Sequence, residues 1–217
     1  MVTSIVNNGS SSIPGLSHRS RGSATQNRIL ERAVQIASVE GLASMSLATL
    51  AKASAMSKSG LFAHFRSKEA LQIAVIDEAD RIFFDSVVAP AQTAPAGIAR
   101  LQALVEGYVS YCSRAPFDGG CFFAAAVHEF DGREGPVRDR VIQHFETWTK
   151  EVRTAAEAAA ASGHFQRGMD VDAFLFELAG IGLSANVSIQ IGRGAEAVKA
   201  QCKTAVASLM ERVTAAN

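Results

Sequence analysis

The 217-residue sequence has only three cysteines, and Cys112, Cys121 and Cys202 lie far apart from one another. None of them belongs to a CxxC pair or stands at a Cys/His spacing that holds a metal ion, so no metal site and no cofactor are expected. An odd number of cysteines without such a framework is typical of a reducing compartment. This pattern predicts a cytoplasmic protein.

Signatures of an enzyme are also missing. There is no P-loop and no GxGxxG motif. The histidines show no evident catalytic spacing; they are His18, His64, His128, His144 and His164. The acids Asp77, Glu78 and Asp80 are typical of a solvated helix face. No catalytic residue is therefore predicted, and a bound metal ion or turnover of a ligand would be needed to favour an enzyme.

Long apolar runs are scarce. The first twenty residues are rich in Ser, Gly and Asn and contain no apolar core of signal-peptide length, so secretion is not expected. The stretch from Phe174 to Gly192 is apolar enough for a membrane span, but Glu177, Asn186 and Gln190 interrupt it. A buried helix is the preferred interpretation of this stretch, and no contact with a membrane is expected.

The sequence does contain ample apolar residues, at 48%, and its charge is unevenly distributed. Alanine is abundant and β-branched clusters are few, which favours helices. The formal net charge is zero, but residues 1–70 hold eight Lys/Arg against three Asp/Glu, and residues 71–217 hold thirteen against eighteen. This asymmetry indicates a small basic module that faces a polyanion, attached to an acidic helical body.

The helix caps and breakers predict an all-α fold with about nine helices and no strand. Residues 1–22 are interpreted as a flexible tail, or alternatively as a basic arm that touches DNA through Arg19 and Arg21. A three-helix domain is expected over residues 23–70, and a larger helical domain over residues 71–217. The expected helices run from Thr25 to Gly41, after Ser46, from Lys58 to about His64, from Lys68 toward Pro90, from Gly97 to about Arg114, from Cys121 to Phe130, from Pro136 to about Ser162, from Asp170 to about Ile191, and from Gly194 to about Thr214.

Two short helices joined by a tight turn are the arrangement that reads the DNA major groove. The groove admits one helix, and the first residues of that helix reach the base edges. Here those residues are Ser57, Lys58, Ser59 and Gly60. The small ones let the backbone approach DNA closely, and Lys58 is the one long donor. Helix N–H groups after Ser57 and Ser67 suit phosphates.

The stretch from Thr25 to Leu71 resembles the DNA-binding domain of the TetR/AcrR family of transcription regulators over its whole length. The most specific part is SKSGLFAHFRSKEAL, from Ser57 to Leu71, supported by RIL at Arg28 to Leu30 and EGL at Glu40 to Leu42. The segment from Gly119 to Val141 resembles a C-terminal type found in a subset of these regulators. The resemblance implies a three-helix DNA-binding domain followed by a helical domain that dimerises and binds a ligand.

The resemblance also implies which residues contact DNA. Thr25 and Thr49 take backbone-contact positions, and Ser57, Lys58, Ser59 and Gly60 take the base-reading positions. His64 takes a phosphate-contact position, and Lys68 both touches phosphate and stands where ligand-driven motion is transmitted. Two positions depart from the family pattern. Phe62 replaces a common Tyr, so we expect this position to serve packing only, and Ala55 replaces a turn Gly, which implies backbone strain.

The second domain is expected to enclose an apolar cavity, since aromatic residues alternate with small ones along its helices. The candidate ligand contacts are Phe84, Tyr108, Phe122, Phe123, Phe145, Trp148 and Phe174, with His128 and Asn186 as the polar groups. Each aromatic residue alternatively packs in the core. Cys121 stands at a helix start, where the N-terminal field lowers a thiol pKa, so it either senses oxidants or electrophiles or is a small buried side chain.

The resemblance implies that the last two helices form a homodimer, as a four-helix bundle across a two-fold axis. The sequence is therefore interpreted as a ligand-responsive regulator, most simply a repressor that leaves a palindromic double-stranded DNA operator when a small, largely apolar effector binds. Activation and co-repression remain open. The other alternative is a helical interaction scaffold, for which DNA affinity would not depend on salt and Lys58→Ala would be tolerated.

Overall fold

The computed structural model describes residues 24–54, 57–114, 116–166 and 168–215, with only the backbone of Ala24 and Lys58. The tail expected over residues 1–22 and the strain expected at Ala55 therefore lie outside the described residues. The helices are α1 (Ala24–Glu40), α2 (Leu47–Ser54), α3 (Lys58–His64), α4 (Lys68–Phe83), the π-helical turn η1 (Phe84–Val88), α5 (Ala89–Gln92), α6 (Ile98–Arg114), α7 (Phe122–Phe130), α8 (Pro136–Ala161), α9 (Val171–Gln190) and α10 (Ala195–Val213).

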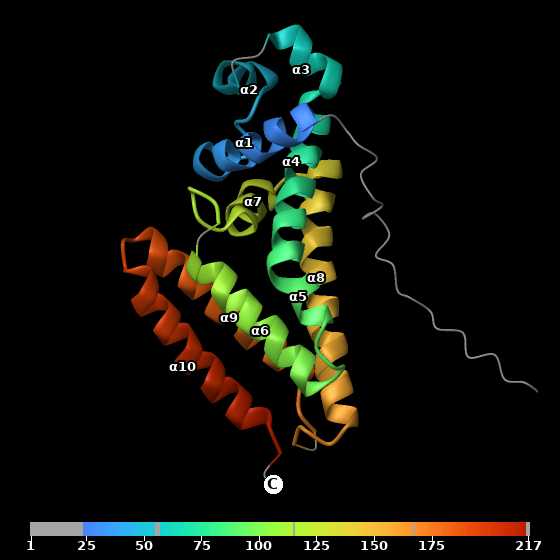
Figure 1. The fold of residues 1–217 in the computed structure, drawn as a ribbon, viewed down its shortest axis with the longest axis vertical. Helices are drawn as coiled ribbons and strands as arrows, with labels where there is room; N and C mark the ends of the chain where they lie inside the picture. The colour runs from blue at the N-terminus through green and yellow to red at the C-terminus, as the bar shows by residue number, and fades with distance from the viewer. Residues whose placement is uncertain (1–23, 55–56, 115, 167, 216–217) are drawn as a thin grey trace, which may run out of the picture.

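A small head at one end of the molecule consists of α1, α2 and α3 (Figure 1). Serine side chains begin its short helices: Ser46 accepts a hydrogen bond from the Thr49 N–H at 3.1 Å, and Ser57 accepts one from the Gly60 N–H at 3.1 Å. Such N-caps satisfy amide donors that a helix leaves free. The three helices bury a shared apolar core that includes Leu30, Leu50 and Leu61.

A long helix leads from the head into the body. α4 begins at Lys68 behind the N-cap Ser67, packs against α1 and α8, and continues without a break through η1 and α5. The sequence led us to expect a break at Pro90, but this proline lies in the first turn of α5, directly after the π-helical turn η1. The wider π turn before it accommodates the ring. If α4, η1 and α5 are counted as one helix, the described residues hold nine helices and no strand beyond an isolated bridge between Phe165 and Thr214.

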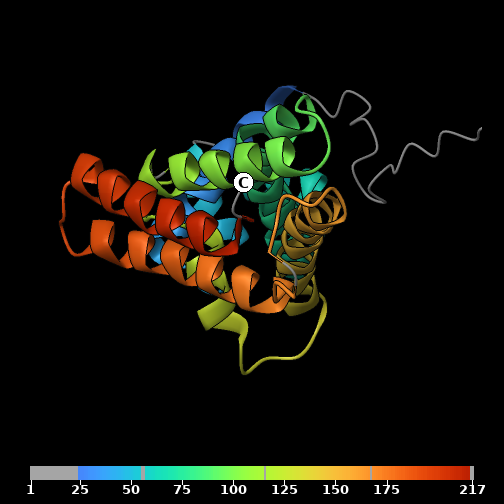
Figure 2. The ribbon, with the colours of Figure 1, turned by 90° about the horizontal axis from the view of Figure 1, so that it is seen from below.

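The body consists of α6 to α10. The long helix α8 runs beside α4, and α7 lies under the head, where it contacts α1 (Figure 1). α9 and α10 form an antiparallel pair along α6, which Figure 2 shows from below. Two apolar clusters fill the interior, one shared by the head, α4 and α7, and one between α6, α8, α9 and α10.

α9 is less buried than the sequence led us to expect. It is long and apolar enough to cross a membrane by length and composition, yet only 22% of its most apolar window is buried within this chain. Phe174 and Leu178 face the core, whereas an outer face exposes Phe176 at 82%, Leu183 at 50% and Val187 at 50%. The expectation of a buried helix was therefore wrong for the single chain. The reason is that the amphipathic pattern buries one face of α9 and leaves a second apolar face without a partner.

Candidate nucleic-acid interface and effector-side core

The start of α3 is an exposed helix N-terminus with small side chains. The Ser57 hydroxyl lies 3.1 Å from the Ser59 hydroxyl, both residues are exposed, and Gly60 is half-buried. Lys58 is the first residue of α3, and its side chain lies outside the described part of the chain. A helix start with small residues leaves room for another molecule to approach the backbone N–H groups.

The other residues predicted to contact DNA are distributed over α1, α2, the end of α3 and the start of α4. Thr25 is half-buried in the first turn of α1, and the Thr49 hydroxyl lies 2.9 Å from the Ser46 hydroxyl, so it is part of the cap of α2. His64 is half-buried at the end of α3, with its ring centroid 6.3 Å from that of Phe65. Phe62 is 52% exposed, so the single chain does not bury the side chain that we expected to serve packing only.

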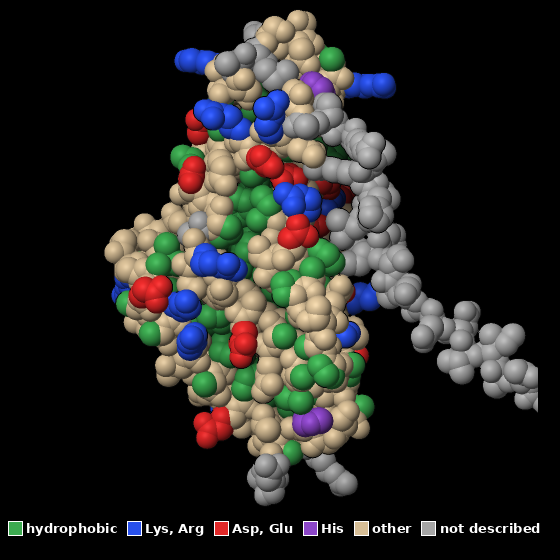
Figure 3. All heavy atoms as spheres, viewed as in Figure 1, with side chains coloured by type: hydrophobic (Ala, Val, Ile, Leu, Met, Phe, Trp, Pro, Cys, Tyr) green, Lys and Arg blue, Asp and Glu red, His purple; other side chains and the backbone are tan. Residues whose placement is uncertain are grey.

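Lys68 is exposed, but it has an intramolecular partner. Its Nζ donates to the carbonyl oxygen of Ala43 at 2.6 Å, which ties the start of α4 to the loop between α1 and α2. Exposed basic side chains elsewhere on the head are Arg28, Arg32, Lys52 and Arg66. In the space-filling view, Lys and Arg side chains project from both sides of the head (Figure 3).

The head is joined to the body by hydrogen bonds from α1. The Gln35 side chain donates to the carbonyl of Pro116 at 3.2 Å and accepts from the N–H of Asp118 at 2.9 Å. The Ser38 hydroxyl accepts from the N–H of Gly119 at 3.0 Å. Side chains of α1 therefore bind backbone groups of the loop between α6 and α7, and these hydrogen bonds hold α1 against that loop.

An aromatic cluster lies where α4, α6, α7 and α8 meet. Of the predicted ligand contacts, Tyr108 packs on Trp148 with centroids 5.2 Å apart, and Phe122 lies 5.3 Å from Phe123. Phe84 is half-buried against the same core, and Phe174 belongs to the second apolar cluster. The structure therefore brings part of the predicted set together and leaves Phe174 apart.

Three predicted ligand contacts have other surroundings. Phe145 is 37% exposed, although its ring still approaches Phe123 at 6.3 Å. His128 is exposed on α7. The Asn186 side-chain oxygen accepts from the N–H of Cys121 at 2.8 Å, so it binds the start of α7.

Sequence reasoning did not identify several members of the aromatic cluster. Phe83 contacts Tyr111, His144 and Trp148 edge-on, at centroid distances of 5.0, 4.9 and 5.2 Å. The hydroxyl of Tyr111 is buried, and no other described residue forms a hydrogen bond with it. A buried donor without a partner is costly to the folded state. Helical spacing from Tyr108 along α6 was the one signal in the sequence that pointed to Tyr111.

A polar network joins α4 to α8 beside this cluster. His144 Nδ1 lies 2.6 Å from Asp80, and Arg140 bonds both Asp80 and Asp77 at 2.7 Å. The side chain of Asp80 is only 20% exposed, and Glu78 is buried in an ion pair with Arg81. The expectation of a solvated acidic face was wrong for these two residues, because α8 supplies His144 and Arg140 to Asp80, and Arg81 of α4 itself pairs with Glu78.

The network shifts two pKa values in the same direction. Burial lowers the pKa of His144 below 6.5, although the bond to Asp80 opposes it. Burial by itself would raise the pKa of Asp80, but hydrogen bonds and charge from His144 and Arg140 outweigh it and hold that pKa below 3.8. The ring of His144 is stacked on Phe123, with centroids 3.3 Å apart, and Phe83 and Phe145 contact it edge-on.

These shifts predict a protein that loses stability in acid. Both groups bind a proton more tightly in the unfolded chain, so unfolding takes up protons and the free energy of unfolding falls as the pH falls. We expect the loss to begin as the pH drops through 6.5, from His144, and to continue below 3.8, from Asp80. Urea unfolding from about pH 8 to about pH 5 measures the part of the loss that comes from His144. His144→Phe should flatten this dependence and His164→Gln should not; equal slopes in the two variants would contradict the prediction.

Cys121 does not have the lowered pKa that its place at a helix start suggested. Burial raises the pKa of this thiol, and hydrogen bonds from the backbone at Ala124 and Phe123 only partly oppose that effect. The three cysteines are free thiols. Of the two alternatives for Cys121, the small buried side chain agrees with this raised pKa, because burial disfavours the thiolate more than the helix start favours it.

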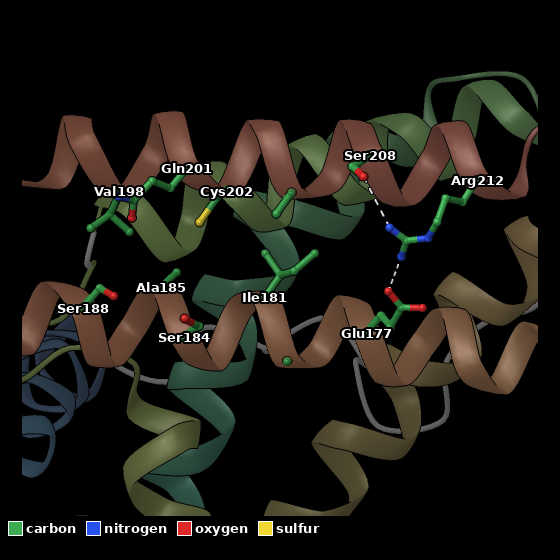
Figure 4. A pocket seen from close by; sticks show the side chains of 12 residues that line it. Glu177, Ile181, Ser184, Ala185, Ser188, Val198, Gln201, Cys202, Ser208 and Arg212 are labelled. Atoms are coloured by element: carbon green, nitrogen blue, oxygen red, sulfur yellow. Dashed lines mark hydrogen bonds and ion pairs between the residues drawn. The ribbon is translucent and has the colours of Figure 1, made fainter.

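A groove of about 450 Å³ runs between α9 and α10. Figure 4 shows its small and apolar lining, including Ile181, Ser184 and Cys202. At one end Arg212 bonds Glu177 across the two helices and donates to Ser208 at 3.3 Å. The exposed apolar residues of α9 lie on the outer side of the same helix pair. An open groove beside an apolar ridge is a surface that another helix can pack against.

An exposed helix-turn-helix head, joined by a long helix to a helical body with an aromatic core, defines a helical DNA-binding regulator. Two family profiles match the sequence: "Bacterial regulatory proteins, tetR family" over residues 29–75, and "Tetracyclin repressor-like, C-terminal domain" over residues 97–205. The chain belongs to the TetR family of transcriptional regulators.

Solved structures support this assignment. A TetR-family transcriptional regulator from Streptomyces coelicolor is 25% identical, with 88% of this chain and 90% of that chain covered and a TM-score of 0.73. A TetR transcriptional regulator from Chloroflexus aurantiacus is 22% identical, with 88% and 97% covered and a TM-score of 0.75. AibR, solved in complex with isovaleryl coenzyme A and operator DNA, is 22% identical, with 81% and 95% covered and a TM-score of 0.63. None of the curated proteins matches the sequence.

Proposed function

We propose that this protein is a cytoplasmic homodimeric repressor that binds a palindromic operator through α3 and releases it when a small, largely apolar effector enters the body. The observation that carries the proposal is the exposed start of α3, with Ser57, Ser59 and Gly60 over a helix N-terminus. In this proposal Thr25, Thr49, Lys58, His64 and Lys68 contact the DNA backbone or bases around that turn. DNA binding rather than catalysis is also the activity of the family to which the chain belongs.

The exposed apolar face of α9 supports the dimer. Leu183 and Val187 are one helical turn apart and each is 50% exposed, and the groove beside them offers small residues to a second copy. A two-fold axis parallel to this ridge would form a bundle of four helices, two from each chain. Palindromic operators match such symmetry, with half-sites roughly 34–36 Å apart.

The aromatic cluster supports an effector site between α4, α6, α7 and α8. Packed aromatic side chains around the Tyr111 hydroxyl, which no other described residue bonds, suit a small apolar molecule that carries one hydrogen-bond acceptor. Trp148 lies in the cluster and is the only tryptophan of the sequence. A change in its fluorescence on adding a candidate effector therefore reports binding there.

The test of the proposed function is binding to the DNA that flanks the protein's own gene, measured across a salt series. We expect saturable binding of a dimer, with the logarithm of affinity falling against that of salt by about 0.9 per phosphate contact. Lys58→Ala and Lys68→Ala should each lower the slope by about one contact, because each removes one cation. His64→Ala should weaken binding as well.

Lys203→Ala is the matched control, since Lys203 is an exposed cation on α10, in the body. It should leave both the affinity and the salt slope unchanged. Weak binding that is equal in the wild type and all variants would contradict a DNA-reading head and favour the scaffold alternative. Tighter DNA binding on addition of the effector would show co-repression in place of release.

A further inference from the structure

The loop between α1 and α2 presents two backbone donors to the body of the protein. Gly41 ends α1 with a positive φ of 88°, a conformation that glycine adopts without strain. After this turn the N–H groups of Leu42 and Ala43 both donate to the carboxylate of Glu129, at 3.1 and 2.6 Å. Glu129 belongs to α7, far away in the sequence, so one side chain of the body holds two consecutive amides of the head.

The same loop is held from its other side by α4. The carbonyl of Leu42 accepts from the buried side chain of Gln72 at 2.8 Å, and the carbonyl of Ala43 accepts from Lys68 at 2.6 Å. The loop leads directly into α2, the first helix of the helix-turn-helix. Its position relative to the body is therefore set jointly by α7 and α4.

The opposite end of α7 is anchored where the effector site is proposed. The N–H of Cys121, the N-cap of α7, donates to Asn186 of α9 at 2.8 Å. Phe123, in the first turn of α7, is stacked on His144 of α8. α7 is only nine residues long, so a displacement at its first turn also moves Glu129 near its last turn.

We propose that Glu129 is a positioning residue that latches the helix-turn-helix to the body and carries a shift of α7 to the recognition helix, in parallel with α4. This inference rests on the proposed function and names the contact through which it is regulated. The carboxylate suits the task because charge-assisted hydrogen bonds to two N–H groups are stronger and more directional than neutral ones. Gly41 leaves the necessary space, since a Cβ there would lie 3.1 Å from the carboxylate.

The first test measures the latch without DNA. In the full-length protein, Glu129→Ala should make the amides of Leu42 and Ala43 exchange hydrogen about tenfold faster, because each loses its charged acceptor. Amides in the core of the head, such as that of Leu50, should keep their protection. Glu129→Gln, which retains one acceptor oxygen, should lie between the wild type and Glu129→Ala. Glu134→Ala is the control, since Glu134 is an exposed acid in the loop after α7.

The second test separates positioning from simple stability. The test uses the DNA fragment that the wild type binds most tightly in the salt series. Glu129→Ala should lower the affinity for this fragment by about tenfold and leave the affinity for unrelated DNA unchanged. The variant loses the fixed orientation of the two heads that specific binding needs, but it keeps the positive charges that bind any DNA. If the amide hydrogen-exchange rates of Leu42 and Ala43 were unchanged, or if affinity fell equally for both DNAs, the proposed positioning role of Glu129 would be wrong. A wild type without specific DNA binding would overturn the proposed function instead, and the exchange result would still decide whether the latch exists.

Discussion

Leu183→Glu combined with Val187→Glu should leave the protein monomeric and lower its operator affinity by on the order of 100-fold. A dimer binds both half-sites of the operator at once, whereas a monomer binds a single half-site and loses the gain in affinity from the linkage. Both side chains are half-exposed in the single chain, so the charges should not disturb its core. In a dimer, however, each would be buried against an apolar partner, where an unpaired carboxylate is strongly disfavoured. Analytical ultracentrifugation measures the mass, and the salt series measures the affinity.

The control for this experiment adds the same charge at another place. Gln143→Glu combined with Lys150→Gln lowers the net charge by the same amount at exposed positions of α8, and should leave the dimer intact. If the α9 variant remained a dimer of unchanged affinity, the two-fold interface would have to lie elsewhere on the body. If both double variants became monomeric, the effect would come from net charge rather than from the α9 face.

Gly119→Ala should lower the free energy of unfolding by about 3 kcal/mol, because the added methyl group cannot fit between the head and the body. A Cβ at this position would lie 1.8 Å from the carbonyl oxygen of Ser38 and 2.3 Å from its carbonyl carbon. These are backbone atoms of α1, so no side-chain rotation relieves the overlap. The loop would have to withdraw from α1 and break the bond between the Gly119 N–H and the Ser38 hydroxyl.

Gly132→Ala is the matched control for this variant. Nothing lies within 4 Å of a Cβ at Gly132, so its alanine variant should differ from the wild type by less than about 0.5 kcal/mol. Urea unfolding of the three proteins, with the slope against urea compared as well as the midpoint, gives the differences. Equal stability of the two alanine variants would mean that the loop before α7 is not packed against α1.

The helices were largely predictable because the signals that begin and end them are local. Ser57, Ser67 and Asp170 cap helices that begin where the sequence predicted them to begin, and each accepts a hydrogen bond from an amide at most three residues further on. Capping and helical periodicity act within one or two turns of a helix, so they can be recognised in the sequence without knowledge of the fold. The TetR-like run from Ser57 to Leu71 is equally local, and the family match confirms it.

The contacts that shape the candidate sites were not predictable in this way. Asp80 and His144 are 64 residues apart, and Glu129 lies 87 residues from Leu42, so only the packing of α4, α7 and α8 brings them together. The pKa of Cys121 was unpredictable for the same reason. The sequence shows that this thiol stands at a helix start, which lowers its pKa, but it does not show the burial that raises the pKa by more.

The sequence by itself determined the all-α class, the caps and the helix-turn-helix motif of the family, because each depends on neighbours along the chain. Tertiary structure alone decided which polar groups pair across helices, which face of α9 lacks a partner and how the head is attached to the body. Those outcomes depend on distances between segments that the chain order does not constrain, and hydrogen bonds and burial act only over a few ångströms.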